Sequence, residues 1–277
     1  MSPRCLRSLV TSRDWRADRE AVFDRDGHSC RHCGTDGGDD DPVTLRLFPV
    51  GDVPLEGDVH ESALVTVCDD CFATLEAPPS TDPVASDDLF HRVRETTGVQ
   101  GETISDVASF ASVATSLPAT LESAVDDGTD AALDDSISAY RRSRRDVLLA
   151  IAIVDARLER LAAIDDGAYD PEIWTALEDF SDTAADLQST LREVVTLSET
   201  VAVGLERCHG CFDSLEGETC KRCGLEAYET AAWQDEDGTL AFEALFETIN
   251  DRLQGASATT ETLTDRTTTL ARRLTAA

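Results

Sequence analysis

Four Cys-x-x-Cys pairs constrain the fold of this 277-residue chain more than any other feature of its sequence. A Cys-x-x-Cys turn directs two thiolates toward one tetrahedral metal ion, so two such turns complete a four-cysteine site. Two pairs lie in the N-terminal third of the chain and two lie close together further on, which predicts two separate structural zinc ions. The predicted ligands are Cys30, Cys33, Cys68 and Cys71 for one ion, and Cys208, Cys211, Cys220 and Cys223 for the other.

The rest of the sequence favours metal binding over disulfide formation. There is no apolar run of about 18 residues, the length that a membrane span requires, and the N-terminus lacks the apolar core of a signal peptide. We therefore expect a cytoplasmic protein that contacts no membrane and whose cysteines are reduced. Cys5 is the only cysteine outside the four pairs, and we expect it to be a small, half-buried side chain.

The charge composition is strongly acidic, with a formal net charge of −31 and Lys221 as the only lysine. Acidic residues are spread along the whole chain, which resembles the composition of proteins from salt-loving archaea. An acidic disordered chain is excluded because 41% of the residues are hydrophobic and recur periodically. In molar salt, charges are screened within about 3 Å, so the net charge does not identify a partner.

The N-terminal residues predict a small mixed domain over 1–78. A helix is expected over 12–26, a strand over 43–50, and a second cysteine turn leading into a short helix over 62–77. A polar segment with several prolines follows, and it predicts a linker over 79–88. The remaining residues, 89–277, predict an acidic helical bundle.

Heptad repeats predict three long helices over 136–164, 171–206 and 240–275, packed as an antiparallel bundle. A shorter helix over 101–126 completes four, and Pro118 is expected to bend or end it. Arg144 occupies a heptad core position, so it either meets a buried acid or marks the end of the packed seam. The heptads also fit pairing between two chains, so a homo-oligomer is an alternative.

Three segments of the N-terminal domain resemble the HNH endonuclease module, or ββα-metal fold, over about residues 12–77. They are "DWRADREAVFDRDGHSCRHCG", "VTLRLFPV" and "SALVTVCDDCF". The resemblance implies that four cysteines hold a structural zinc. In that family, histidines and an asparagine also bind a catalytic divalent ion and activate water.

The catalytic half of the family's pattern is missing from this sequence. Phe48 and Pro49 stand where the family's histidine pair belongs, Ala63 replaces the asparagine, and Phe72 replaces the final histidine. None of these side chains accepts a proton or ligates magnesium, so no catalytic divalent metal is expected. The two phenylalanines are expected to fill the space of the absent metal with apolar contacts.

Other residues offer a weak route to a rebuilt catalytic site. His60 lies in the loop before the second cysteine turn and is the candidate base, with Asp52 and Asp58 as possible oxygen ligands. The simpler interpretation makes His60 a solvent-facing loop residue.

Residues 207–226 resemble a short zinc ribbon between two heptad helices. Zinc ribbons in many proteins contact nucleic acid, but this segment lacks a basic stripe. We therefore favour a structural interpretation, in which zinc clamps the turn of a helical hairpin.

Arginines are concentrated in two places in the sequence. Seven lie between positions 4 and 31, and a dense cluster, "RRSRR", occupies 141–145. Arginines on a helix can contact phosphates through two hydrogen bonds. The favoured interpretation of 141–145 is nevertheless a solvated helix face paired with neighbouring acids.

These observations predict an α+β protein: a small treble-clef-like ββα zinc module followed by a mainly α-helical, coiled-coil-like bundle that carries a zinc ribbon. The favoured function is non-catalytic interaction with nucleic acid or another protein. The first alternative is an active HNH-type endonuclease that hydrolyses DNA at a rebuilt site. The second is a helical adaptor in which both zinc ions only stabilise the fold.

Overall fold

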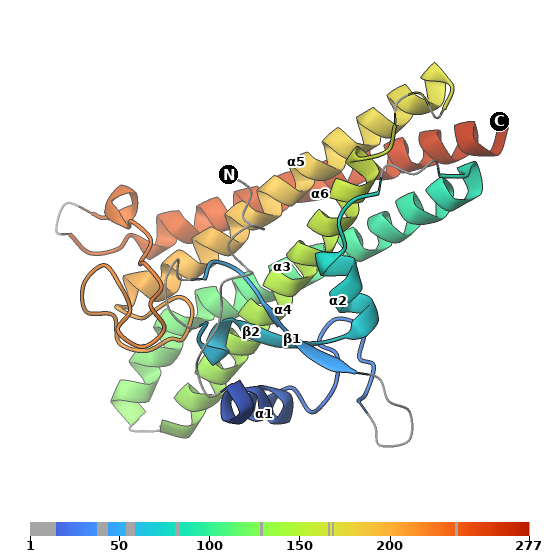
Figure 1. Cartoon of the computed structure of the whole chain (residues 1–277). Coiled ribbons are helices and arrows are strands. Elements are labelled where there is room, and N and C mark those ends of the chain that lie inside the picture. The colour runs from blue at the N-terminus through green and yellow to red at the C-terminus, as the bar shows by residue number, and fades with distance from the viewer. Residues whose placement is uncertain are drawn as a thin grey trace.

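The computed structural model describes residues 15–37, 44–53, 59–80, 84–127, 130–165, 167, 169–235 and 238–276. Four long helices form a bundle, and a small N-terminal module lies against one side of it (Figure 1). The bundle helices are α3 (Ser86–Asp127), α4 (Asp130–Ala162), α5 (Pro171–Gly204) and α6 (Phe242–Ala276). The predicted α+β fold class is therefore confirmed. Within the described residues, no helix has the length and apolar character needed to cross a membrane.

The N-terminal module contains two short helices, a two-stranded hairpin and a turn of 3-10 helix. Its elements are α1 (Trp15–Arg25), β1 (Leu45–Pro49), η3 (Glu61–Ala63), β2 (Leu64–Cys68) and α2 (Asp69–Glu76). The strands pair antiparallel, with Leu45 opposite Cys68 and Pro49 opposite Leu64. A further 3-10 turn, η5 (Ala231–Trp233), lies between α5 and α6.

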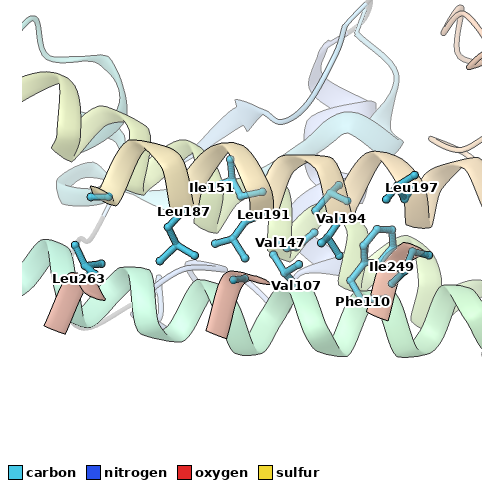
Figure 2. Close-up of a cluster of buried hydrophobic side chains, with 14 of the residues drawn as sticks. Val107, Phe110, Val147, Ile151, Leu187, Leu191, Val194, Leu197, Ile249 and Leu263 are labelled. Carbon is cyan, nitrogen blue, oxygen red and sulfur yellow. The ribbon is translucent and has the colours of Figure 1, made fainter. Parts of the chain in front are cut away.

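The heptad positions of α5 form the centre of the bundle core, as predicted. Leu187, Leu191 and Val194 are fully buried, and Figure 2 shows them facing Val107 and Phe110 of α3. Such apolar burial contributes about 25 cal/mol per Å2 of surface removed from water. The seam also includes Leu245 on α6, which is fully buried and which the heptad assignment missed.

Helix α3 is longer than the predicted 101–126 helix. It begins at Ser86, because Leu89 and Val93 extend its apolar face into the bundle core. The prediction that Pro118 could end the first part of this helix is wrong, since α3 continues through it to Asp127. A proline in a helix removes one backbone hydrogen bond, and the burial of the neighbouring Leu117 offsets that cost.

Helix α4 belongs to two cores at once. Val147 and Ile151 face the bundle, whereas Leu149 and Ile153 pack against the hairpin. The hairpin face that covers α4 consists of Phe48, Val50, Val65 and Val67. Its other face packs against α1, and there Leu64 contacts Val22. Helix α4 therefore fixes the N-terminal module to the bundle.

Arg144 on α4 meets a buried acid, which confirms the first of the two predicted alternatives. Its side chain is 1% exposed and its Nε atom donates to Glu199 on α5. The Tyr228 hydroxyl donates to the other oxygen of Glu199 at 2.7 Å. This network joins two bundle helices to the segment that follows the second cysteine cluster.

We predict that Leu191→Asp destabilises the protein by more than about 4 kcal/mol, because it places an unpaired carboxylate in the bundle seam. Chemical denaturation in concentrated potassium chloride measures the change. Ser189→Asp, on the exposed side of the same helix, is the matched control and should change stability by less than about 0.5 kcal/mol. Equal free energies of unfolding for the Leu191 variant and the parent would show that Leu191 does not lie in the bundle core.

We also predict that Glu199→Gln destabilises the protein by about 3 kcal/mol, because it leaves the Arg144 charge buried without its counter-charge. The double variant Arg144→Met/Glu199→Leu should recover most of that loss, since it removes both buried charges. Thermal unfolding of the two variants makes the comparison. A single variant as stable as the parent would contradict the buried pair.

Candidate functional site

The first cysteine turn is a knuckle held by the backbone. The Cys30 amide donates a hydrogen bond to the Thr35 carbonyl at 2.8 Å, and the Gly34 amide donates one to the Cys30 carbonyl at 2.9 Å. Gly34 has φ of 72°, a left-handed conformation that glycine adopts without steric cost. This geometry turns Cys30 and Cys33 toward the same point.

The other two sulfurs of this cluster come from the junction of β2 and α2. Cys68 ends β2 and is the N-cap residue of α2, and Cys71 lies in the helix's first turn. The four Sγ atoms lie within 4.8 Å of one another, and those of Cys33 and Cys68 are 3.7 Å apart. A tetrahedral zinc with bonds of about 2.3 Å separates its sulfurs by about 3.8 Å, so the cluster fits zinc.

Both Cys-x-x-Cys turns of the second cluster have the same backbone hydrogen bond as the first knuckle. The Cys208 amide donates to Asp213 and the Cys220 amide to Leu225, both at 2.8 Å. The four buried sulfurs, from Cys208, Cys211, Cys220 and Cys223, lie within 4.8 Å of one another. Their closest pairs are separated by 3.4 and 3.6 Å. The cluster lies between α5 and α6, where a zinc that clamps the helical hairpin would have to lie.

The thiols of the first cluster do not favour full ionisation on their own. A hydrogen bond from Cys71 lowers the pKa of Cys30 to about 4. The same bond raises the pKa of Cys71 well above its usual range, and burial adds to that effect. One thiolate is therefore stable in the apoprotein, whereas four adjacent thiolates require a cation such as Zn2+ to balance their charge.

Phe212 anchors the second cluster to the bundle, a role that sequence reasoning missed. It occupies the knuckle position that Gly34 holds in the first cluster, with φ of 60°. A left-handed conformation costs a non-glycine residue about 1 kcal/mol. Its ring lies 5.2 Å from that of Tyr140 on α4, and the Tyr140 hydroxyl donates to the His209 carbonyl. Burial of the Phe212 ring offsets the strain.

Two of the four positions that the resemblance aligns with HNH catalytic residues, Phe48 and Phe72, form an apolar contact. The rings of Phe48 on β1 and Phe72 on α2 meet edge to face, with centroids 6.5 Å apart. The guanidinium of Arg46 lies over the Phe72 ring, 4.8 Å from its centroid. Ala63 packs in a separate cluster with Val22, so it does not join the two phenylalanines. Pro49 pairs with Leu64 at the end of the hairpin.

The candidates for a rebuilt site are not brought together. His60 caps η3 and accepts a hydrogen bond from the Ser62 amide at 3.1 Å. Asp52 lines a different cavity, beside Arg144 and Tyr228. Asp58, like Cys5, lies outside the described residues. Within the described chain, the only groupings of His, Cys, Asp and Glu able to hold a metal are the two cysteine clusters.

A cavity of about 520 Å3 opens between the N-terminal module, the start of α4 and the second cluster. His60, Ser62 and Ser138 contribute polar groups to it, and Asp26 and Glu61 are its acidic residues. Six arginines line it: Arg25, Arg31, Arg141, Arg142, Arg145 and Arg222. We call it the arginine cavity.

Half of these arginines have a carboxylate partner. Arg25 pairs with Asp26, Arg31 with Asp146, and Arg222 with Asp213. The other three, Arg141, Arg142 and Arg145, have no ion-pair partner among the described residues. The cavity therefore combines several cationic side chains with few acids, in contrast to the net charge of −31 of the chain.

Arg145 is the most constrained of the three. Only 8% of its surface is exposed. Burial, reinforced by the nearby charge of Arg25, lowers the pKa of its guanidinium to about 10. The interpretation of 141–145 as a solvated face paired with acids is wrong here, because Arg144 and Arg145 are both buried and only Arg144 is paired. The N-terminal module covers this face of α4, which the helical periodicity of α4 alone did not indicate.

No protein-family model, curated protein or solved structure matches this chain. The HNH resemblance therefore receives no support from a family assignment. The function has to be argued from two four-cysteine clusters suited to zinc and from the arginine cavity beside them.

We predict two zinc ions per chain, measured by elemental analysis of protein purified in high salt. Cys71→Ser and Cys220→Ser should each lose one ion, because each removes a ligand from a different cluster. Each site should contribute on the order of 10 kcal/mol of apparent binding free energy at neutral pH, so chelators should unfold the surrounding segment. Cys5→Ser is the control and should keep both ions. One zinc or none in the parent would contradict the assignment.

Proposed function

We propose that this protein is a non-catalytic nucleic-acid-binding protein whose two zinc ions hold a phosphate-binding cavity in shape. The arginine cavity carries the proposal. It places six guanidinium groups around one space, and three of these have no carboxylate partner among the described residues. A planar guanidinium donates two parallel hydrogen bonds to a phosphate, which makes arginine the favoured side chain for phosphate recognition.

The burial of Arg145 favours a phosphate ligand over water as the partner of this side chain. A buried charge without a counter-charge is costly, and proteins pair such charges with an ion or a ligand. Arg145 is 8% exposed and forms no ion pair with a described carboxylate, since the nearby Asp26 and Asp146 pair with Arg25 and Arg31. An anion that enters the cavity would supply a counter-charge in direct contact.

The acidic composition supports a buried site rather than a basic surface stripe. In molar salt, exposed charges attract phosphates only across about 3 Å. Contacts made inside a cavity are screened much less, because little solvent separates the charges. A protein adapted to such salt would therefore bind nucleic acid through enclosed arginines, which is what the position of Arg145 offers.

The absence of catalysis follows from the residues at the HNH positions. We propose that the N-terminal module is HNH-like and has lost its reaction centre. The contact between Phe48 and Phe72, the residues that the resemblance aligns with HNH histidines, supports this proposal, because neither ring can ligate magnesium. Hydrolysis of a phosphodiester by one metal requires both a base and a metal that neutralises phosphate charge.

The alternative of an active endonuclease retains one specific observation in its favour. His60 lines the arginine cavity, so it lies beside the groups that we propose to hold phosphate. Its Nδ1 atom is already engaged with the Ser62 amide, and the one metal-holding group of the described residues that borders this cavity is the second cysteine cluster, which does not include His60. These two facts place it second to the non-catalytic proposal.

We predict no cleavage of plasmid or single-stranded DNA with magnesium or manganese in concentrated potassium chloride. His60→Ala is assayed beside the parent. Cleavage that copurifies with the parent and disappears in the His60→Ala variant would overturn the non-catalytic proposal and favour the endonuclease. Cleavage that is unchanged in the variant would identify a contaminant.

We predict that the parent binds DNA or RNA oligonucleotides and that Arg145→Gln weakens binding at least about tenfold, since a charge-assisted hydrogen bond contributes about 1.5–3 kcal/mol. Fluorescence anisotropy in potassium chloride measures the affinity. Arg252→Gln is the matched control, because Arg252 is exposed on α6, pairs with Glu193 and lies outside the cavity. The absence of binding to every oligonucleotide would leave the helical adaptor as the better account.

A further inference from the structure

We propose that the arginine cavity binds the terminal phosphomonoester of a nucleic-acid strand in preference to an internal phosphodiester. This inference rests on the proposed function and specifies which phosphate the cavity recognises. It is carried by the burial of Arg145 and by the three guanidiniums that line the cavity without an ion-pair partner among the described residues.

The depth of Arg145 limits which phosphates can reach it. An internal phosphate is flanked by a sugar on each side, so the chain must enter and leave any site that contacts it. Arg145 is 8% exposed and lies among residues from α4, the η3 loop and the second cluster. A terminal phosphate is attached to the strand on one side only, so a single opening to the cavity is sufficient for it to reach Arg145.

The charge of the cavity matches a monoester better than a diester. A phosphomonoester carries about −1.5 to −2 charges at pH 7 and has three terminal oxygens, whereas an internal diester carries one charge. Arg141, Arg142 and Arg145 all lack an ion-pair partner among the described residues. The Nε atom of Arg141 is also buried without a hydrogen-bond partner. Three guanidiniums can thus share three oxygens.

The electrostatics around Arg145 also favour a strongly charged anion. Burial and the neighbouring charges of Arg25 and Arg31 lower its pKa to about 10, so the guanidinium stays protonated at neutral pH but its charge is less well stabilised than that of an exposed arginine. The carboxylates of Asp26 and Asp146 act in the opposite direction, but they are paired with Arg25 and Arg31. A bound dianion would relieve the repulsion among the arginines.

The size of the cavity allows more than a phosphate. Small-molecule sites in proteins commonly span about 300–1,000 Å3, and the arginine cavity measures about 520 Å3. This volume accommodates a phosphate together with the nucleoside attached to it. Ser138 at the wall provides a hydroxyl group for the sugar or base, whereas the Ser62 hydroxyl is engaged with His60.

The same phosphomonoester chemistry occurs at a strand end and in a free nucleoside monophosphate. The experiment separates the two sources with four labelled probes of one sequence, a single-stranded 12-mer. All carry an internal label, and their ends are a 5′-phosphate, a 3′-phosphate, phosphates at both ends or hydroxyls at both ends; unlabelled nucleoside monophosphate is the competitor. Fluorescence anisotropy in concentrated potassium chloride measures each affinity with zinc-loaded full-length protein.

We expect one phosphorylated 12-mer to bind at least about tenfold more tightly than the hydroxyl-ended 12-mer, because it adds charge-assisted hydrogen bonds. Arg145→Gln should abolish this preference, so that phosphorylated and hydroxyl-ended probes bind the variant with equal affinity. Arg142→Gln, on the exposed side of α4, provides a second test if the Arg145 variant does not fold. Arg252→Gln should keep the full preference.

Three outcomes distinguish the possibilities. Equal binding of phosphorylated and hydroxyl-ended probes overturns this inference but leaves the proposed function intact. No binding of any probe overturns both. Competition by nucleoside monophosphate as effective as by the phosphorylated 12-mer identifies a nucleotide pocket and overturns the assignment to strand ends.

Discussion

The packing of the β1–β2 hairpin on Leu149 and Ile153 of α4 is the contact on which the rest of the structure depends. Val147 and Ile151, on the opposite face of α4, pack in the bundle core. The two faces of one helix therefore join the N-terminal module to the bundle. The same contact covers the preceding turn of α4, so Arg145 is buried against the module instead of pointing into solvent.

The two cysteine clusters stabilise segments that are too small to form cores of their own. Each also positions an arginine of the cavity. Arg31 lies inside the first knuckle, and its amide donates to Thr66 of β2 at 2.9 Å. Arg222 lies inside the last knuckle, between Cys220 and Cys223. If an anion binds in this cavity as we propose, its binding should depend on zinc, because loss of either ion would release one wall of the cavity.

Local patterns in the sequence were sufficient to predict the cysteine clusters and the long helices α4, α5 and α6, but not the full length of α3. Cys-x-x-Cys spacing fixes ligand pairs, and the heptads of α5 place Leu187 and Leu191 in the core. The arginine cavity could not be predicted in this way. It combines Arg25, Arg145 and Arg222, which come from three distant segments, and their proximity depends on how the module docks on α4. The heptad pattern singled out Arg144, whereas its neighbour Arg145 faces the cavity and depends on tertiary contacts.

The central claim is that an anion binds beside Arg145, and diffraction from crystals soaked in tungstate tests it most directly. The anomalous signal of tungsten locates a tetrahedral dianion without reference to activity. The account predicts a peak inside the arginine cavity, within hydrogen-bonding distance of Arg145 and of Arg141 or Arg142. A cavity without a peak, or one in which a carboxylate of the same chain pairs with Arg145, would contradict it.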